Sequence, residues 1–191
     1  MKKGNYLNLI LRSNKSVFSF TDIALLWQDS SQAARVRLNY YLKKGYLYKP
    51  CKGFYAKDED YSYLELGNKI YTPSYISFET VLIEAGIIFQ TSSKICLASY
   101  LSREIQVSKQ AYIFHKIKDN VLTSPEGLEL RDNYFVASFE RAFLDTLYIY
   151  KNYYFDNLEV LNWNKVKEMV PIYNNKRLER EVKNYLSKYG F

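Results

Sequence analysis

Two helical patterns joined by a tight turn lie between residues 21 and 45 of this 191-residue chain. Thr21 is the expected cap of the first helix, because its hydroxyl can accept a hydrogen bond from a free backbone amide. Ser31 is the expected cap of the second helix, which runs to Lys44 and ends at Gly45, a residue type that adopts the left-handed conformation readily. This order is typical of the helix-turn-helix motif, whose second helix enters the major groove of DNA.

The second of these helices has one apolar stripe, and its other sides are polar or basic. Ala34, Leu38 and Tyr41 recur at i, i+4 and i+7, so we expect them to face the core. Arginine can read guanine, and asparagine or glutamine can read adenine, because each offers a matching pair of hydrogen-bonding groups. A solvated helix surface without a partner would have the same composition. The candidate DNA-contacting residues of this helix are Ser31, Gln32, Arg35, Arg37, Asn39, Lys43 and Lys44.

A β-hairpin is predicted directly after this helix. Two short strands rich in aromatic residues, at 46–50 and 54–57, flank a glycine-containing turn. Lys49 and Lys52 are expected at the tip, within reach of a phosphate or of the minor groove. The elements expected before the two helices are a helix at 3–11 and a strand at 17–20. The order of helix, strand, helix, helix and hairpin predicts a winged helix-turn-helix.

The charge of the chain is concentrated in this region. Residues 1–57 contain eleven basic and two acidic side chains, a balance of +9, whereas the remaining residues contain 16 basic and 18 acidic side chains, a balance of −2. A basic module favours binding to phosphates, because each cation placed on a phosphate also releases condensed counterions. The sign of the charge reverses at 57–60, so we place the domain boundary there. The predicted domains are a DNA-binding domain at 1–57 and a second domain at 58–191.

The second domain mixes helical and extended patterns. Helices are expected at 60–70, between Ser77 as a cap and Gly86, after Ser138 as a cap, at 165–170 and at 176–188. Extended segments are expected at 94–99, 104–107 and 111–116. The predicted fold class is therefore α+β, with a winged helix-turn-helix followed by a mixed α/β domain.

Two motifs in the second domain resemble a known family. The segment Pro73-Ser74-Tyr75-Ile76-Ser77, followed by Glu79 and Leu82, is similar to a block found before a helix in AbiEi-type antitoxins, which are transcriptional regulators of abortive-infection systems. The segment 137–145, Ala-Ser-Phe-Glu-Arg-Ala-Phe-Leu-Asp, is similar to a helix start of the same family, with Phe139 where the family usually has proline. Proline at the first helical position only preorganises the helix, so this departure need not alter the fold.

The resemblance implies two roles. The N-terminal domain would repress its own operon by binding double-stranded operator DNA upstream of it. The second domain would counteract a cognate nucleotidyltransferase toxin of a phage-defence operon, as a type IV antitoxin that needs no stable complex with the toxin. A domain that binds the toxin directly is the alternative.

Composition leaves little support for catalysis. A single histidine, His115, and two cysteines 45 positions apart, Cys51 and Cys96, cannot build a zinc centre of four cysteines or of two cysteines and two histidines. We therefore expect reduced thiols, no catalytic residue, no metal and no cofactor. A metal-dependent nuclease is the enzymatic alternative, with Glu126, Glu129 and Arg131 as its candidate residues.

Hydropathy predicts neither a membrane span nor a signal peptide. The hydrophobic runs, such as that at 23–27, are far shorter than the roughly 20 residues that a membrane-spanning helix needs. The apolar stretch near the N-terminus is interrupted by Asn8 and ends at Arg12. We therefore expect a cytoplasmic protein without a membrane partner.

Overall fold

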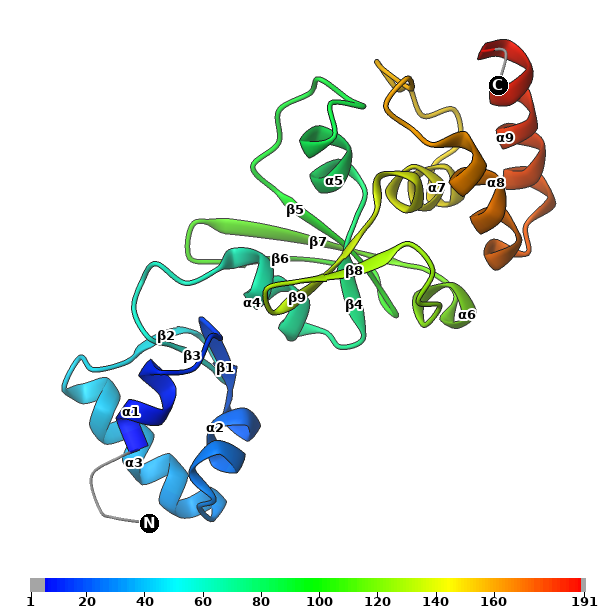
Figure 1. The fold of residues 1–191 in the computed structure, drawn as a ribbon. Coiled ribbons are helices and arrows are strands. Elements are labelled where there is room, and N and C mark those ends of the chain that lie inside the picture. Colours follow the sequence, from blue (N-terminus) through cyan, green and yellow to red (C-terminus); the bar gives the residue numbers. More distant parts are fainter. Residues whose placement is uncertain (1–5, 190–191) are drawn as a thin grey trace.

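Residues 6–189 fold into two sheets with helices packed against them (Figure 1). The computed structural model describes residues 6–189. One sheet has three strands and lies near the N-terminus, and the other has six strands and lies in the larger C-terminal part. The α+β class predicted from the sequence is confirmed.

The N-terminal part, residues 6–57, contains three helices and the small sheet. Its elements are α1 (Tyr6–Leu11), β1 (Val17–Ser19), α2 (Phe20–Trp27), α3 (Ser31–Lys43), β2 (Tyr48–Cys51) and β3 (Phe54–Ala56). The antiparallel strands lie in the order β1-β3-β2. The first five residues, including 3–5 of the helix predicted at 3–11, lie outside the described residues. Seven buried side chains form the core, namely Ile10, Phe18, Ile23, Trp27, Ala34, Leu38 and Leu47.

The helix caps in this part differ from those predicted. Ser19, not Thr21, caps α2: its hydroxyl accepts a hydrogen bond from the Asp22 amide, and the Asp22 carboxylate accepts one from the Ser19 amide. This reciprocal capping box satisfies two amides that the helix leaves free, which one threonine hydroxyl would not do. Ser30, not Ser31, caps α3, because the preceding hydroxyl is the one that reaches the Ala33 amide.

The C-terminal part, residues 58–189, is built on the large sheet. Its elements are α4 (Tyr63–Ile70), β4 (Ser74–Ile76), α5 (Glu79–Glu84), β5 (Ile95–Ser99), β6 (Arg103–Val107), β7 (Gln110–Lys116), α6 (Asp119–Leu122), β8 (Leu128–Arg131), β9 (Tyr134–Ala137), α7 (Phe139–Ile149), α8 (Trp163–Met169), the 3₁₀ helix η1 (Val170–Tyr173) and α9 (Lys176–Tyr189). The strand order is β6-β7-β5-β4-β9-β8, with parallel pairs β5/β7 and β4/β9.

Helices cover both faces of the large sheet. In Figure 1, α4 lies on one side of the sheet and α5 and α7 lie on the other, with α8 and α9 beyond α7. Gly67 of α4 packs so closely on Tyr112 of β7 that an added Cβ atom would lie 2.7 Å from the tyrosine ring. The large core of buried side chains lies between these layers.

In the C-terminal part, the structure shows one hairpin that the sequence analysis did not predict, corrects one predicted helix cap and confirms another. The segment 128–137, for which the sequence analysis predicts no strand, is a hairpin, β8 and β9, with Asp132 at φ 48° in its turn. Ser77 does not cap α5: Phe78 occupies the N-cap position without a side-chain cap. The Ser77 hydroxyl instead donates a hydrogen bond to the buried carboxylate of Asp145, an electrostatically stronger partner than a backbone amide. The predicted cap Ser138 is confirmed, because its hydroxyl accepts from the Arg141 amide.

The two parts contact each other through α4. The Glu65 carboxylate, which is 2% exposed, accepts hydrogen bonds from the amide and hydroxyl of Ser16 at 2.9 and 2.7 Å. Lys69 pairs with the same carboxylate at 2.6 Å and also donates to the Val17 carbonyl. Val17 and Ala56 of the small sheet belong to the larger core. Buried apolar and polar contacts therefore cross the boundary at 57–60.

Candidate functional site

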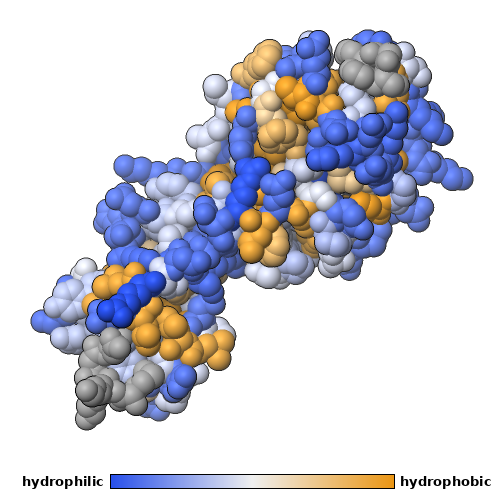
Figure 2. Space-filling view, viewed as in Figure 1, coloured by the Kyte–Doolittle hydropathy of each residue, from blue (hydrophilic) through white to orange (hydrophobic). Residues whose placement is uncertain are grey.

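The exposed face of α3 is separate from the face that packs in the core. Ala34 and Leu38 are 0% and 1% exposed and lie in the small core with Trp27. The exposed face repeats at helical spacing and consists of Gln32, Arg35, Val36, Asn39, Tyr40 and Lys43. Val36 is 68% exposed and Tyr40 is 53% exposed, so this face combines polar, cationic and apolar groups. Apolar residues exposed on the N-terminal part appear in orange in Figure 2.

Arg37 is placed differently from the other candidates on α3. Its guanidinium pairs with the Asp29 carboxylate, with Nη2 and Nε at 3.1 and 3.2 Å from Oδ2. It also lies 3.5 Å from the centre of the Tyr6 ring and 5.8 Å from that of Trp27. These contacts tie α1, α2 and α3 together, because a guanidinium can pair with a carboxylate and stack on aromatic rings at once.

The remaining cationic candidates have no ion-pair partner among residues 6–189. Arg35 is exposed, and its guanidinium carbon lies 5.1 Å from the centre of the Phe20 ring, which leaves its hydrogen-bond donors free to meet another molecule. Ser31 and Lys43, the first and last residues of α3, are exposed, and so is Lys44, which follows the helix as its C-cap.

The predicted hairpin is present, but only one of its two lysines lies at the tip. Lys49 lies within β2 rather than at the tip. Lys52 lies in the two-residue turn with Gly53, whose φ of +89° favours glycine. The Phe20 amide donates to the Gly53 carbonyl at 3.0 Å, so the turn lies at the start of α2. Lys52 and the exposed face of α3 therefore belong to one small unit.

The two motifs that resemble the AbiEi family meet inside the C-terminal core. Asp145 accepts hydrogen bonds from the hydroxyls of Tyr75, Ser77 and Tyr173, the last at 2.7 Å. Arg141 lies one helical turn before it, with Nε at 3.5 Å from Oδ1, and both side chains are fully buried. Burial raises the pKa of the Asp145 carboxyl, against the opposing effect of Arg141 and the hydroxyls. These side chains are all buried, so the polar network that they form stabilises the fold.

A second cluster in the C-terminal part joins residues that no sequence motif groups together. Glu79, Cys96 and His115 come from α5, β5 and β7, and each donor atom lies within 4.8 Å of the others. The register of the parallel strands explains this, because Cys96 is opposite Ile113 and His115 is two residues farther on the same face. Burial, and then the Glu79 carboxylate, raise the pKa of the Cys96 thiol. Burial lowers the pKa of His115.

The candidate nuclease residues, Glu126, Glu129 and Arg131, do not form a comparable cluster of metal-ligating side chains. Glu126 is exposed and hydrogen-bonds to Ser124. Arg131 of β8 pairs with Glu84 at 2.8 Å and with Glu129 at 3.5 Å. Among residues 6–189, neither Glu126 nor Glu129 belongs to a group of three close metal-ligating side chains.

No protein-family model and no curated protein matches this chain. The likeness to the AbiEi family therefore depends on the two motifs and on the order of elements. Within residues 6–189, no helix is long and apolar enough to cross a membrane.

Proposed function

We propose that the N-terminal part binds double-stranded DNA as a winged helix-turn-helix, with α3 in the major groove and the β2/β3 hairpin beside it. The observation that carries this proposal is the division of α3 into two faces. One face packs on Trp27, and the other presents Gln32, Arg35 and Asn39 to solvent. These are the side-chain types that form paired hydrogen bonds with adenine and guanine.

The candidate residues have distinct roles in this proposal. Gln32, Arg35 and Asn39 read base edges, and Val36 contacts the methyl group of thymine. Arg37 orients α3 through Asp29 and makes no contact with DNA. The groups that bind phosphates are the side chains of Ser31, Lys43, Lys44, Lys49 and Lys52.

The test measures binding to a DNA fragment taken from upstream of the chain's own gene, by fluorescence anisotropy at several salt concentrations. If Arg35 and the four lysines each meet one phosphate or base, the slope of log K against log salt is no steeper than about −4.5. Arg35→Ala should reduce the preference for this fragment over unrelated DNA, whereas Lys52→Ala should weaken binding to both equally. Lys165→Ala, which removes an exposed lysine of α8, is the matched control and should change neither. An affinity independent of salt would refute the proposal.

We also propose, from the resemblance to AbiEi-type antitoxins, that the chain represses its own operon and that the C-terminal part counteracts a nucleotidyltransferase toxin. The resemblance rests on the motifs that meet at Asp145. The test is co-expression with the product of the adjacent gene. The full chain should restore growth, and so should Arg35→Ala, because DNA binding and toxin antagonism belong to different parts. Continued growth arrest would contradict the antitoxin role, and stable co-purification of the two proteins would indicate direct binding instead of a type IV mechanism.

A further inference from the structure

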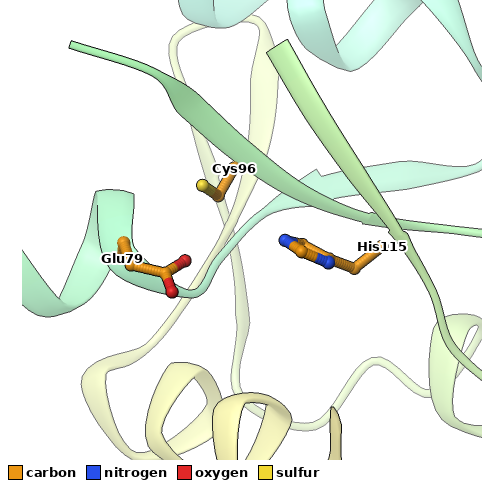
Figure 3. A group of neighbouring side chains, drawn as sticks. All are labelled: Glu79, Cys96 and His115. Carbon is orange, nitrogen blue, oxygen red and sulfur yellow. The ribbon is translucent and has the colours of Figure 1, made fainter. Parts of the chain in front are cut away.

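The cluster of Glu79, Cys96 and His115 contains three kinds of metal-ligating atom. Figure 3 shows the carboxylate, the thiol and the imidazole directed toward a common region, from one helix and two strands. Thiolate sulfur, imidazole nitrogen and carboxylate oxygen are the three ligand types that Zn²⁺ takes in proteins. We propose that these three side chains bind one Zn²⁺ ion and leave a fourth position for water or another small ligand.

The spacing of the donor atoms suits an ion of this size. Each pair of donors lies within 4.8 Å. Zinc bonds of about 2.3 Å to sulfur and about 2.0 Å to nitrogen or oxygen imply distances of roughly 3.5 Å between ligands in a tetrahedral site. The side chains therefore need to move inward by about 1 Å, which rotations about their side-chain bonds can supply.

One oxygen of the cluster lacks an adequate partner. Glu79 Oε2 is buried and accepts no hydrogen bond of ordinary geometry, while Oε1 accepts a long bond of 3.3 Å from Tyr153. The carboxylate lies against the Cys96 thiol, but a thiol is only a weak donor. A buried carboxylate oxygen that accepts no good hydrogen bond destabilises the folded state, and coordination to a divalent cation would remove this cost.

The surroundings resemble the outer shell of a metal site. Hydroxyl groups of Tyr150 and Tyr153 lie against two of the ligands, with the Tyr150 hydroxyl 3.4 Å from His115 Nε2. The Phe78 ring packs on the imidazole with centroids 4.6 Å apart. Groups that hydrogen-bond to ligands and apolar groups that exclude water fix ligand orientation in metal proteins. Glu79 and His115 are only half-buried, which leaves a path for the ion to enter.

The composition of the chain makes the proposal easy to test. His115 is its one histidine, and Cys51 is its one other cysteine. Tag-free, chelator-treated full-length protein is titrated with Co²⁺, which gives visible absorption in a tetrahedral site and a charge-transfer band when a thiolate is bound. Wild type and Cys51→Ser should both show one Co²⁺ per chain with the charge-transfer band, and Zn²⁺ should abolish the spectrum. On binding, the metal replaces the thiol proton, which passes to solvent.

Variants identify the ligands. Cys96→Ser should lose the charge-transfer band, and His115→Gln should weaken Zn²⁺ binding at least about tenfold, as should Tyr153→Phe through Glu79. X-ray absorption of the zinc-loaded wild type should show one sulfur neighbour at about 2.3 Å, which tests the site even if a variant fails to fold. The absence of Co²⁺ absorption in wild type, or a charge-transfer band that survives in Cys96→Ser, would overturn the proposal. This outcome is independent of DNA binding, because the cluster and α3 are tested separately.

Discussion

Replacement of Asp145 by asparagine should destabilise the C-terminal part strongly. Asp145 is fully buried, accepts three hydroxyl hydrogen bonds and faces the buried guanidinium of Arg141. The asparagine side chain would keep a similar shape but lose the negative charge. Arg141 would then retain only neutral acceptors, the carbonyls of Val121 and Glu126 and the Tyr75 hydroxyl.

These contacts set the expected loss of unfolding free energy in Asp145→Asn. Removal of one partner of a buried ion pair costs about 3–5 kcal/mol, because the remaining charge stays in a medium of low polarity. The asparagine oxygen can still accept hydrogen bonds, so we expect a value near the lower limit, about 3 kcal/mol. This is a large fraction of the roughly 5–15 kcal/mol that stabilises a typical domain.

Urea unfolding monitored by tryptophan fluorescence can measure this loss. The chain has two tryptophans, Trp27 in the N-terminal core and Trp163 beside Phe143 in the C-terminal core. In a Trp27→Phe background, the fluorescence of Trp163 therefore reports the unfolding of the C-terminal part. Asp60→Asn, at an exposed position, is the matched control and should change stability by less than about 0.5 kcal/mol.

A double variant distinguishes the ion pair from packing. Arg141→Met combined with Asp145→Leu removes both charges, so part of the loss seen in Asp145→Asn should be recovered. If the stability of Asp145→Asn lies within about 0.5 kcal/mol of that of wild type, the network does not stabilise the core in the way that its contacts indicate.

Three further predictions concern the helix starts and the contacts of α4. Glu65→Gln, which weakens the contact with Ser16, should lower stability by about 2 kcal/mol in thermal unfolding and speed trypsin cleavage between the two parts; an unchanged cleavage rate would contradict this. Burial opposes ionisation of Asp22, but hydrogen bonds from Ser19 and the charge of Lys15 outweigh it and hold the pKa below 3.8. Its stabilisation is therefore present above pH 3.8 and lost as pH falls through the folded pKa. Wild type and Asp22→Asn should thus differ in urea midpoint at pH 7, and the difference should shrink as the pH falls below 3.8. Gly67→Ala should cost about 1–3 kcal/mol in thermal unfolding, because the added methyl overlaps a buried tyrosine ring; an unchanged melting temperature would show that the ring moves aside freely.

Helix positions are predictable where a cap and an apolar stripe agree. Ser138 begins α7 as expected, and Gly45 follows α3 with a φ of +69°. The predicted caps of α2 and α3 are each wrong, because neighbouring hydroxyl residues compete for one role. The pattern of Ser19 followed three residues later by Asp22 is a capping-box signature in the sequence and is the signal that identifies the first cap.

Strands at the sheet edge and buried polar partners are less predictable. The hairpin of β8 and β9 was not predicted, although Asp132 and Asn133 form a turn between alternating residues. Serine often caps helices, which is the reason for the prediction at Ser77, but in the structure this residue donates to a carboxylate 68 residues away. Local patterns do not contain such long-range competition for hydrogen bonds.

The sequence by itself determined the α+β class, the concentration of positive charge in residues 1–57 and the division of α3 into an apolar and a polar side, because each depends on local composition or on helical periodicity. Tertiary structure alone decided that Arg37 is held by Asp29, that the two motifs meet at Asp145, and that Glu79, Cys96 and His115 converge. These contacts join residues from different elements. They arise from strand register and helix packing, which local sequence patterns do not predict.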